Sequence, residues 1–269
     1  MRSYKAAAIQ INSQPDLTLN LRNARELIRA AVDEGAELVG LPEYFSFLGD
    51  MPQRRKLAQK ITERTTQFLK ETAHEFNIVL IGGTIPVPAT DQKTYNRCLL
   101  VGPDGNIQAD YDKIHLFDVD LSESESYRES DDIMPGKHHP VTFKSDRFGN
   151  IGLSVCYDLR FPEFYRLLMD QSADLLSVPA AFTATTGRDH WLPLLKARAI
   201  ENTAYVIAPA QCGTHGKTRQ THGHAMIIDP WGDVLADAGT APGYAMATID
   251  PGRLSDVRKR IPSLKHRVL

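Results

Sequence analysis

The sequence has few of the features that mark secreted, membrane-spanning or nucleic-acid-binding proteins. It contains three cysteines in 269 residues, and an odd number at wide spacings does not fit a disulfide framework. No stretch approaches the roughly 18 apolar residues of a membrane span, and the first residues become polar too early for a secretory signal peptide. A net charge of −2 gives no basic surface for nucleic acid. We therefore expect a cytoplasmic protein with reduced thiols and no nucleic-acid or membrane partner.

The motifs of several common enzyme classes are also missing. No G-x-G-x-x-G or G-x-x-x-x-G-K-[ST] occurs, which argues against nucleotide binding, and no G-x-S-x-G occurs, which argues against a serine hydrolase. His215, His222 and His224 lie close together in the sequence, and a metal site is one interpretation. No cysteine or carboxylate completes a recognised zinc spacing around them. We interpret them as polar groups of loops and strands.

The hydrophobic pattern predicts short buried strands that alternate with helices. The strands are expected at residues 5–11, 37–41, 78–84, 150–156, 174–179 and 204–210. The helices are expected at residues 19–35, 52–76 and 190–202, with another beginning near Pro162. Two-strand units about proline–glycine turns are expected at 94–113 and 224–238. The two halves share one order of elements, which predicts layered α/β packing with mixed sheets in a single domain, 1–269.

Three reactive side chains stand where the predicted strands end. Glu43 follows strand 37–41, Cys156 closes strand 150–156, and Lys113 follows the first two-strand unit. Ligands of open α/β sheets bind beyond the carboxyl ends of the strands. A thiolate is a nucleophile, a carboxylate moves protons, and a lysine can stabilise an oxyanion. Spacing alone leaves open whether the three meet, and the alternative is that Cys156 packs in the core.

Six segments together carry a specific resemblance. They are LPEYF (41–45), YDKIHLFDVD (111–120), VCYDLRFPE (155–163), FTATTGRDHW (182–191), KARAIEN (196–202) and GHAMIIDPWG (223–232). In this order and spacing they resemble the nitrilase, or carbon–nitrogen hydrolase, superfamily over essentially the whole chain. The resemblance implies a four-layer α-β-β-α sandwich with two mixed sheets and a hydrolase that needs no cofactor. It also implies a catalytic triad of Glu43, Lys113 and Cys156.

The resemblance implies a role for each of these residues. Glu43 is expected to be the general base, and Cys156 the nucleophile that forms a thioester. Lys113 and the backbone N–H of Tyr157 are expected to hold the oxyanion. Glu129 fits the place of a second glutamate that positions substrate and lysine in this family, although its acidic surroundings would also suit a solvated loop.

The resemblance also suggests a substrate class. The segment 209–232, with FDVD and IPSLKHR, looks most like the branch that hydrolyses deaminated glutathione to 2-oxoglutarate and cysteinylglycine. The alternative is the ω-amidase branch, which acts on 2-oxoglutaramate and 2-oxosuccinamate. Both substrates are 2-oxo acids, so we expect a cationic or hydrogen-bonding clamp. The candidates for binding substrate are Tyr157, Arg160, Thr185, Thr186 and Arg188. For Arg160, an ion pair with Asp158 or Glu163 is the alternative.

Two further expectations follow from the family. Its members commonly form dimers, so we expect a homodimer. Some members are scaffolds or fused modules, so a catalytically silent binding protein on the same fold is the non-enzyme alternative. The intact set of Glu43, Lys113 and Cys156 argues against that alternative, because a silent site would be free to lose any of the three.

Overall fold

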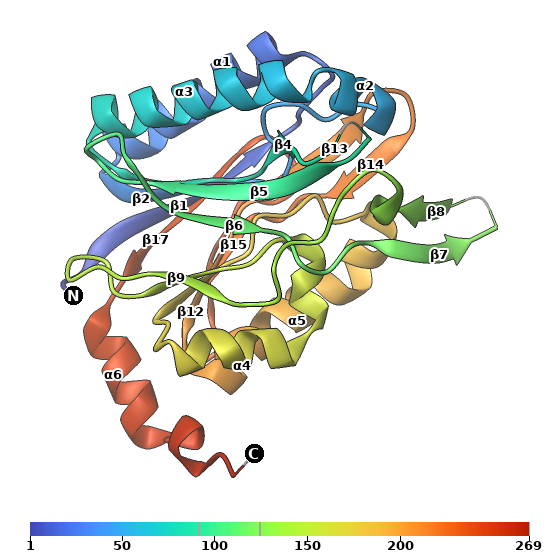
Figure 1. Ribbon diagram of the computed structural model, residues 1–269. Coiled ribbons are helices and arrows are strands. Elements are labelled where there is room, and N and C mark those ends of the chain that lie inside the picture. Colours follow the sequence, from blue (N-terminus) through green and yellow to red (C-terminus); the bar gives the residue numbers. More distant parts are fainter. Residues whose placement is uncertain (91, 124, 269) are drawn as a thin grey trace.

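The fold has four layers. The computed structural model describes residues 1–90, 92–123 and 125–268. Two β-sheets pack face to face, and helices cover the outer face of each (Figure 1). This arrangement confirms the predicted α-β-β-α sandwich with two mixed sheets. No helix within the described residues is both long enough and apolar enough to cross a bilayer.

The helices form the two outer layers. The α-helices are α1 (Leu17–Asp33), α2 (Met51–Lys56), α3 (Ala58–Phe76), α4 (Pro162–Asp170), α5 (Ala184–Asn202) and α6 (Pro251–Arg260). The 3-10 helices are η1 (Glu129–Asp131), η2 (Cys156–Arg160) and η3 (Ser263–His266). Helices α1 and α3 lie on one sheet, whereas α4 and α5 lie on the other (Figure 1). Local sequence sets their starts: Asp16 caps α1 by accepting the N–H of Leu19, and Thr183 caps α5.

The first sheet combines the N-terminal half with strands from the end of the chain. Its order is β14-β13-β1-β2-β3-β5-β4, and β17 pairs with β1 while β6 pairs with β5. Its strands are β1 (Tyr4–Ile11), β2 (Ala36–Leu41), β3 (Val79–Gly82), β4 (Ile85–Pro88), β5 (Thr94–Val101), β6 (Ile107–Asp112), β13 (Ala210–His215), β14 (Arg219–His222) and β17 (Gly243–Ile249). Strands β13, β1, β2 and β3 pair in parallel, and the remaining pairs are antiparallel.

The second sheet belongs to the C-terminal half. Its order is β16-β15-β12-β11-β10-β9. Its strands are β9 (Val141–Phe143), β10 (Ile151–Leu153), β11 (Leu175–Ser177), β12 (Tyr205–Ala208), β15 (Met226–Ile228) and β16 (Val234–Asp237). A separate hairpin of β7 (Asp118–Ser122) and β8 (Glu125–Arg128) projects from the side of the sandwich (Figure 1).

Strand β1 shows how the layers are held together. Successive side chains of a strand point to opposite faces. Ala6 and Ala8 join the apolar cluster between the two sheets, whereas Ala7 and Ile9 join the cluster beneath α1 and α3. Because both faces of β1 are buried, its sequence is apolar nearly throughout.

The structure corrects the sequence prediction around the reactive cysteine. The strand expected at 150–156 ends at Leu153, and Cys156 begins the 3-10 helix η2 instead of closing the strand. The physical cause is Asp158, whose carboxylate accepts the N–H of Val155 at 2.8 Å and turns the chain.

Three other boundaries also differ. The helix expected at 190–202 begins six residues earlier, at Ala184, because Thr183 caps it, and His190 is therefore inside the helix. The helix expected at 52–76 is divided into α2 and α3 at Leu57. The strand expected at 204–210 is divided between the sheets, since β12 lies in the second sheet and β13 in the first.

We predict that Gly83→Ala destabilises the protein far more than Gly216→Ala. Both glycines have a left-handed backbone, with φ +55 and +57, so both substitutions cost about 1–2 kcal/mol of backbone strain. A Cβ at Gly83 would also lie 2.1 Å from the carbonyl oxygen of Pro42, whereas nothing lies within 4 Å at Gly216. We therefore expect a total cost of about 3 kcal/mol or more for Gly83→Ala.

Urea unfolding of the two variants measures this difference directly. Pro42 precedes Glu43, so Gly83→Ala should also lower activity, whereas Gly216→Ala should retain it. Equal unfolding free energies for the two variants would show that the close approach at Gly83 does not constrain the turn.

Candidate active site

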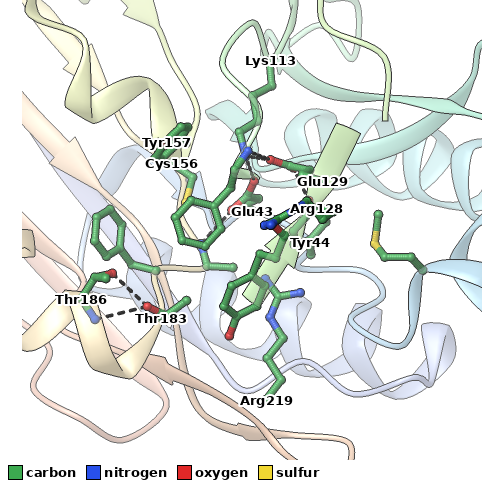
Figure 2. Close-up of a pocket in the computed structure, with 15 residues that line it drawn as sticks. Glu43, Tyr44, Lys113, Arg128, Glu129, Cys156, Tyr157, Thr183, Thr186 and Arg219 are labelled. Atoms are coloured by element: carbon green, nitrogen blue, oxygen red, sulfur yellow. Dashed lines mark hydrogen bonds and ion pairs between the residues drawn. The ribbon is translucent and has the colours of Figure 1, made fainter. Parts of the chain in front are cut away.

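Glu43, Lys113 and Cys156 meet in one cavity of about 100 Å³ (Figure 2). Glu43 lies in the turn after β2, Lys113 directly follows β6, and Cys156 is the first residue of η2. The first two residues come from the first sheet and the third follows a strand of the second sheet. Face-to-face packing of the two sheets therefore brings the three predicted side chains together.

Cys156 is held in an unusual backbone conformation. Its φ is 47, in the left-handed region that residues with a Cβ avoid. The surrounding hydrogen bonds fix this conformation, because the N–H of Cys156 donates to the carbonyl of Pro179 at 2.9 Å. Such strain persists only where the neighbouring structure enforces it, and it is common at functional sites.

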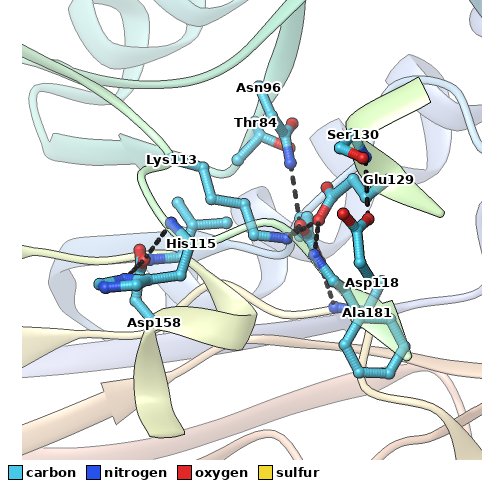
Figure 3. A network of polar contacts seen from close by, with 12 residues as sticks. Thr84, Asn96, Lys113, His115, Asp118, Glu129, Ser130, Asp158 and Ala181 are labelled. Carbon is cyan, nitrogen blue, oxygen red and sulfur yellow. Dashed lines mark hydrogen bonds and ion pairs between the residues drawn. The ribbon is translucent and has the colours of Figure 1, made fainter. Parts of the chain in front are cut away.

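The carboxylate of Asp158 anchors the turn that carries Cys156. It is fully buried and accepts the backbone N–H of Val155, the hydroxyl of Tyr111 at 2.8 Å and the backbone N–H of His115 at 3.2 Å. The ring of His115 lies 2.7 Å away on the same carboxylate (Figure 3). These contacts come from the first sheet and the segment after it, so Asp158 joins the nucleophile turn to the opposite half of the chain.

Glu43 is fixed by hydrogen bonds to both of its carboxylate oxygens. Oε1 accepts the side-chain amide of Asn96 at 2.9 Å and Nζ of Lys113 at 3.1 Å. Oε2 accepts the backbone N–H of Ala181 at 3.0 Å. The charge of this carboxylate also raises the pKa of the Cys156 thiol, which lines the same cavity. Glu43 and the thiol whose proton it would have to remove therefore face the same cavity.

Lys113 lies between two carboxylates. Its Nζ is 3.1 Å from Glu43 and 2.7 Å from Glu129, and its side chain is 2% exposed. Glu129 in turn accepts the backbone N–H of Phe117 and the hydroxyl of Tyr44, both at 2.7 Å. Glu129 is thus part of a buried network (Figure 2), and it does not lie in a solvated loop.

Electrostatics keep Lys113 and Glu129 ionised. Burial alone would lower the pKa of Lys113, but the carboxylates of Glu129 and Glu43 hold it well above its ordinary value. Burial alone would raise the pKa of Glu129, but the charge and hydrogen bond of Lys113, with the N–H of Phe117 and the hydroxyl of Tyr44, hold it below the ordinary value.

The thiol of Cys156 is uncharged in this arrangement. Burial raises its pKa well above the ordinary value, the charge of Glu43 raises it further, and Lys113 offsets only part of the effect. The site therefore holds a thiol beside a base, in contrast to a preformed thiolate. Proton transfer to Glu43 has to accompany attack by sulfur.

A second buried cation lies behind the network. Arg54 is 2% exposed, its guanidinium lies 4.3 Å from the ring centroid of Tyr44, and its Nη2 donates to Asn96 at 3.3 Å. Burial lowers the pKa of Arg54, whereas Glu129 and Glu43 raise it. Two carboxylates are thus balanced by two cations. The sequence pattern did not indicate Arg54, because it occurs in a basic run, QRRK, that resembles an exposed helix end.

The candidates for substrate binding divide into two groups. Tyr157 and Thr186 line the cavity. Arg160, Thr185 and Arg188 are outside the lining residues and contact His190, Glu125 and Asp189, respectively. The alternative ion pair of Arg160 with Asp158 or Glu163 is not formed among the described residues. A substrate role for Tyr157, Arg160, Thr185 and Thr186 remains a prediction.

Several lining residues were not anticipated. They are Tyr44, Met51, Phe117, Tyr127, Arg128, Ala181, Phe182, Thr183 and Arg219. Tyr44, Phe117, Phe182 and Thr183 lie within the family segments, and this was the available signal. Arg219 lies within the segment 209–232 that indicated the substrate branch, but the sequence did not place it in the cavity, which it reaches through the pairing of β13 with β14.

The three histidines do not gather around a common centre. His215 is buried and contacts the carbonyl of Ser13 and the hydroxyl of Thr221, both at 2.7 Å. Burial lowers its pKa to about 4. His222 and His224 stack with ring centroids 4.7 Å apart. Within the described part of the chain, no group of three or more His, Cys, Asp or Glu is placed to hold a metal ion.

Comparison with known proteins identifies relatives of this chain. Residues 5–259 match the family described as carbon-nitrogen hydrolase. A deaminated glutathione amidase from Synechocystis sp. strain PCC 6803 / GT-S is 54% identical over 270 residues, covering 100% of this chain and 99% of that protein. The human omega-amidase NIT2 is 36% identical over 267 residues, covering 99% of this chain and 96% of that protein.

A solved structure extends the comparison to three dimensions. The crystal structure of Saccharomyces cerevisiae Nit3, described as a member of branch 10 of the nitrilase superfamily, superposes with a TM-score of 0.88 at 32% identity. The match covers 100% of this chain and 97% of that chain. The sandwich is therefore the nitrilase-like fold.

We predict that Cys156 reacts with iodoacetamide at pH 7 on the order of 100-fold faster than Cys98 or Cys212, because Glu43 can accept its proton. Burial raises the pKa of Cys98 to about 12 and of Cys212 to about 11, and neither thiol lines the cavity. Mass spectrometry of tryptic peptides gives all three rates in one sample.

Glu43→Gln is the matched control, since it keeps the shape of the side chain and removes the base. The advantage of Cys156 should disappear in this variant. An unchanged rate in Glu43→Gln would exclude Glu43 as the base, and slow, equal labelling of all three thiols in the unmodified protein would favour the silent binding module.

We predict that Glu129→Gln lowers the free energy of unfolding by about 3 kcal/mol at pH 7, because it removes one partner of a buried ion pair. The pKa of Glu129 is lowered in the folded state. Its contribution is therefore fully present above the ordinary carboxyl range and is lost as the pH falls through the lowered value. The difference between the two proteins should shrink on acidification.

Urea unfolding at several pH values measures this dependence. Glu123→Gln is the control, since Glu123 is exposed in the same region of the chain and should change stability by less than about 0.5 kcal/mol. A difference that stayed constant down to acidic pH would show that the charge of Glu129 does not contribute to stability.

Proposed function

The chain belongs to the carbon–nitrogen hydrolase family and is an amidase of the nitrilase superfamily, and on that premise we propose that it hydrolyses deaminated glutathione to 2-oxoglutarate and cysteinylglycine. The observation that supports the chemistry is the meeting of Glu43, Lys113 and Cys156 in one cavity. The observation that supports the substrate is 54% identity, over the whole chain, to a deaminated glutathione amidase.

The first step of the proposed mechanism forms a thioester. Glu43 takes the proton of the Cys156 thiol as the sulfur attacks the amide carbonyl carbon. Lys113 has three donor protons, two of which are directed at Glu43 and Glu129, so the third is available for the oxyanion. The backbone N–H of Tyr157, at the start of η2, is the second donor. Collapse of the tetrahedral intermediate breaks the C–N bond, and Glu43 returns its proton to the departing amine.

The second step releases the acid. Glu43, which is again a carboxylate, takes a proton from a water molecule that attacks the thioester carbonyl. The same two donors hold the second oxyanion. When this intermediate collapses, the sulfur leaves, recovers its proton from Glu43, and frees 2-oxoglutarate. Glu129 takes no proton in either step; its role is to hold Lys113 in position.

The runner-up substrate is an ω-amide of a small 2-oxo acid, such as 2-oxoglutaramate or 2-oxosuccinamate. The same triad would perform that reaction, and ammonia would leave in place of cysteinylglycine. Full-length similarity at 36% to an omega-amidase supports this alternative, but it is weaker than the similarity to the deaminated glutathione amidase. The site favours an enzyme over a silent binding module, because the side chains of Glu43, Lys113 and Cys156 line the same cavity.

We further propose that the chain acts as a cytoplasmic homodimer with one catalytic domain. Free thiols fit a reducing compartment, since Cys98, Cys156 and Cys212 are all buried and unpaired. Apolar side chains on the second helical layer support a self-associating surface. Leu167 on α4 and Leu192 and Ile200 on α5 are 46%, 41% and 50% exposed.

We predict that deaminated glutathione is turned over with a kcat/KM at least about 10-fold above that of 2-oxoglutaramate, the factor of one well-used binding contact. Both reactions release 2-oxoglutarate, so one coupled dehydrogenase assay follows both. The reverse preference would make the chain an ω-amidase.

Two variants control this assay. Cys156→Ala removes the nucleophile and should abolish both activities. Cys98→Ala removes a thiol that lies in the core, away from the lining residues, and should keep both. Turnover that survives in Cys156→Ala would exclude the thioester mechanism.

A further inference from the structure

Arg219 presents an unpartnered guanidinium to the catalytic cavity. It lies at the first position of β14 and lines the cavity beside Tyr44 (Figure 2). Its guanidinium carbon is 5.6 Å from the ring centroid of Tyr44. Its Nε is buried and has no hydrogen-bond partner, and no carboxylate of the described residues lies within ion-pair distance. A buried donor without a partner is costly, and in native proteins it calls for an explanation.

The other cations of the cavity are already engaged. Lys113 is held between Glu43 and Glu129. Arg128 forms two hydrogen bonds of 2.7 Å with Asp120. Among the described lining residues, Arg219 is therefore the cation that is free to bind an anion from outside. A guanidinium matches a carboxylate particularly well, since its N–H groups can form two parallel bonds.

The position of Arg219 indicates which carboxylate it meets. Besides the catalytic cavity, Arg219 lines two outer hollows, one with Glu125 and Gln220 and the other with Lys217 and His215. It thus stands at the boundary between the nucleophile's cavity and the surface. An amide with free ammonia as leaving group has no atoms that extend to this boundary. An amide of a dipeptide places its terminal carboxylate several bonds beyond the reacting carbonyl.

We propose that Arg219 binds the carboxylate at the far end of the amine leaving group and so selects anionic peptide amines over ammonia. This inference rests on the proposed function, because it assigns one end of that substrate. It also makes Arg219, a residue outside the Glu–Lys–Cys triad, responsible for the preference between deaminated glutathione and the ω-amides. The contact is made before and during the reaction alike, so its loss should act mainly on KM.

The test removes the charge from the enzyme and from the substrate in turn. Arg219→Gln should lower kcat/KM for deaminated glutathione about 10- to 100-fold, the factor of a hydrogen bond to a charged group. Activity on 2-oxoglutaramate should change less than about 2-fold. For the unmodified enzyme, kcat/KM should fall by the same factor when the terminal carboxylate of deaminated glutathione is replaced by an amide. The Arg219→Gln variant should turn over deaminated glutathione and its terminal amide with similar kcat/KM.

Arg22→Gln is the control for loss of one positive charge, since Arg22 is exposed on α1, in the other helical layer. It should leave both activities unchanged. An equal loss on both substrates in Arg219→Gln would assign the residue to the 2-oxo acid end and overturn the proposal. An unchanged kcat/KM for deaminated glutathione would also overturn it.

A binding experiment separates this inference from the proposed function. Cysteinylglycine is titrated calorimetrically into Cys156→Ala protein and into the same protein with Arg219→Gln. Binding that weakens about 10-fold or more with Arg219→Gln supports the leaving-group site even if deaminated glutathione is not turned over. If deaminated glutathione is turned over and cysteinylglycine binding does not depend on Arg219, the proposed function stands and this inference fails.

Discussion

The ion cluster around Lys113 is the interaction on which the site depends. A buried ammonium is costly, and it is stable here because two carboxylates compensate its desolvation. One of them, Glu43, is the proposed base, and the other, Glu129, also accepts the hydroxyl of Tyr44. The buried guanidinium of Arg54 compensates the charge of Glu129.

The same cluster explains why the nucleophile remains a thiol. A lysine beside a cysteine usually favours the thiolate, but here burial and the carboxylate of Glu43 raise the pKa of Cys156 more than Lys113 lowers it. Lys113 is already neutralised by its own partners. The ammonium of Lys113 therefore stabilises the oxyanion and not a resting thiolate. The sulfur becomes anionic only as Glu43 takes its proton. This division of roles requires the three side chains to be fixed before substrate binds.

Much of this arrangement could be predicted from the sequence, because it depends on patterns with a physical cause. Apolar runs predicted the central strands of both sheets but not β4, β9, β14 or β17. The segments around Glu43, Lys113 and Cys156 predicted the fold and the reaction class. What could not be predicted depends on contacts between distant residues. The left-handed backbone of Cys156 is enforced by Asp158 and Pro179, and the early start of α5 depends on a single cap at Thr183.

The position of Arg219 shows the same limit in the part of the site that would select substrate. After β12 in the second sheet, the chain crosses to the first sheet. There β13 pairs with β1, and β14 pairs antiparallel with β13. That crossing is a property of the sheet topology, which no local pattern encodes. It carries a guanidinium to the outer end of a cavity whose inner end holds the nucleophile. Chemistry and selectivity thus come from different constraints: buried charges near the strand ends determine the reaction, and in the proposed role of Arg219 the β13–β14 hairpin, formed after the chain has crossed from the second sheet to the first, determines which leaving group is recognised.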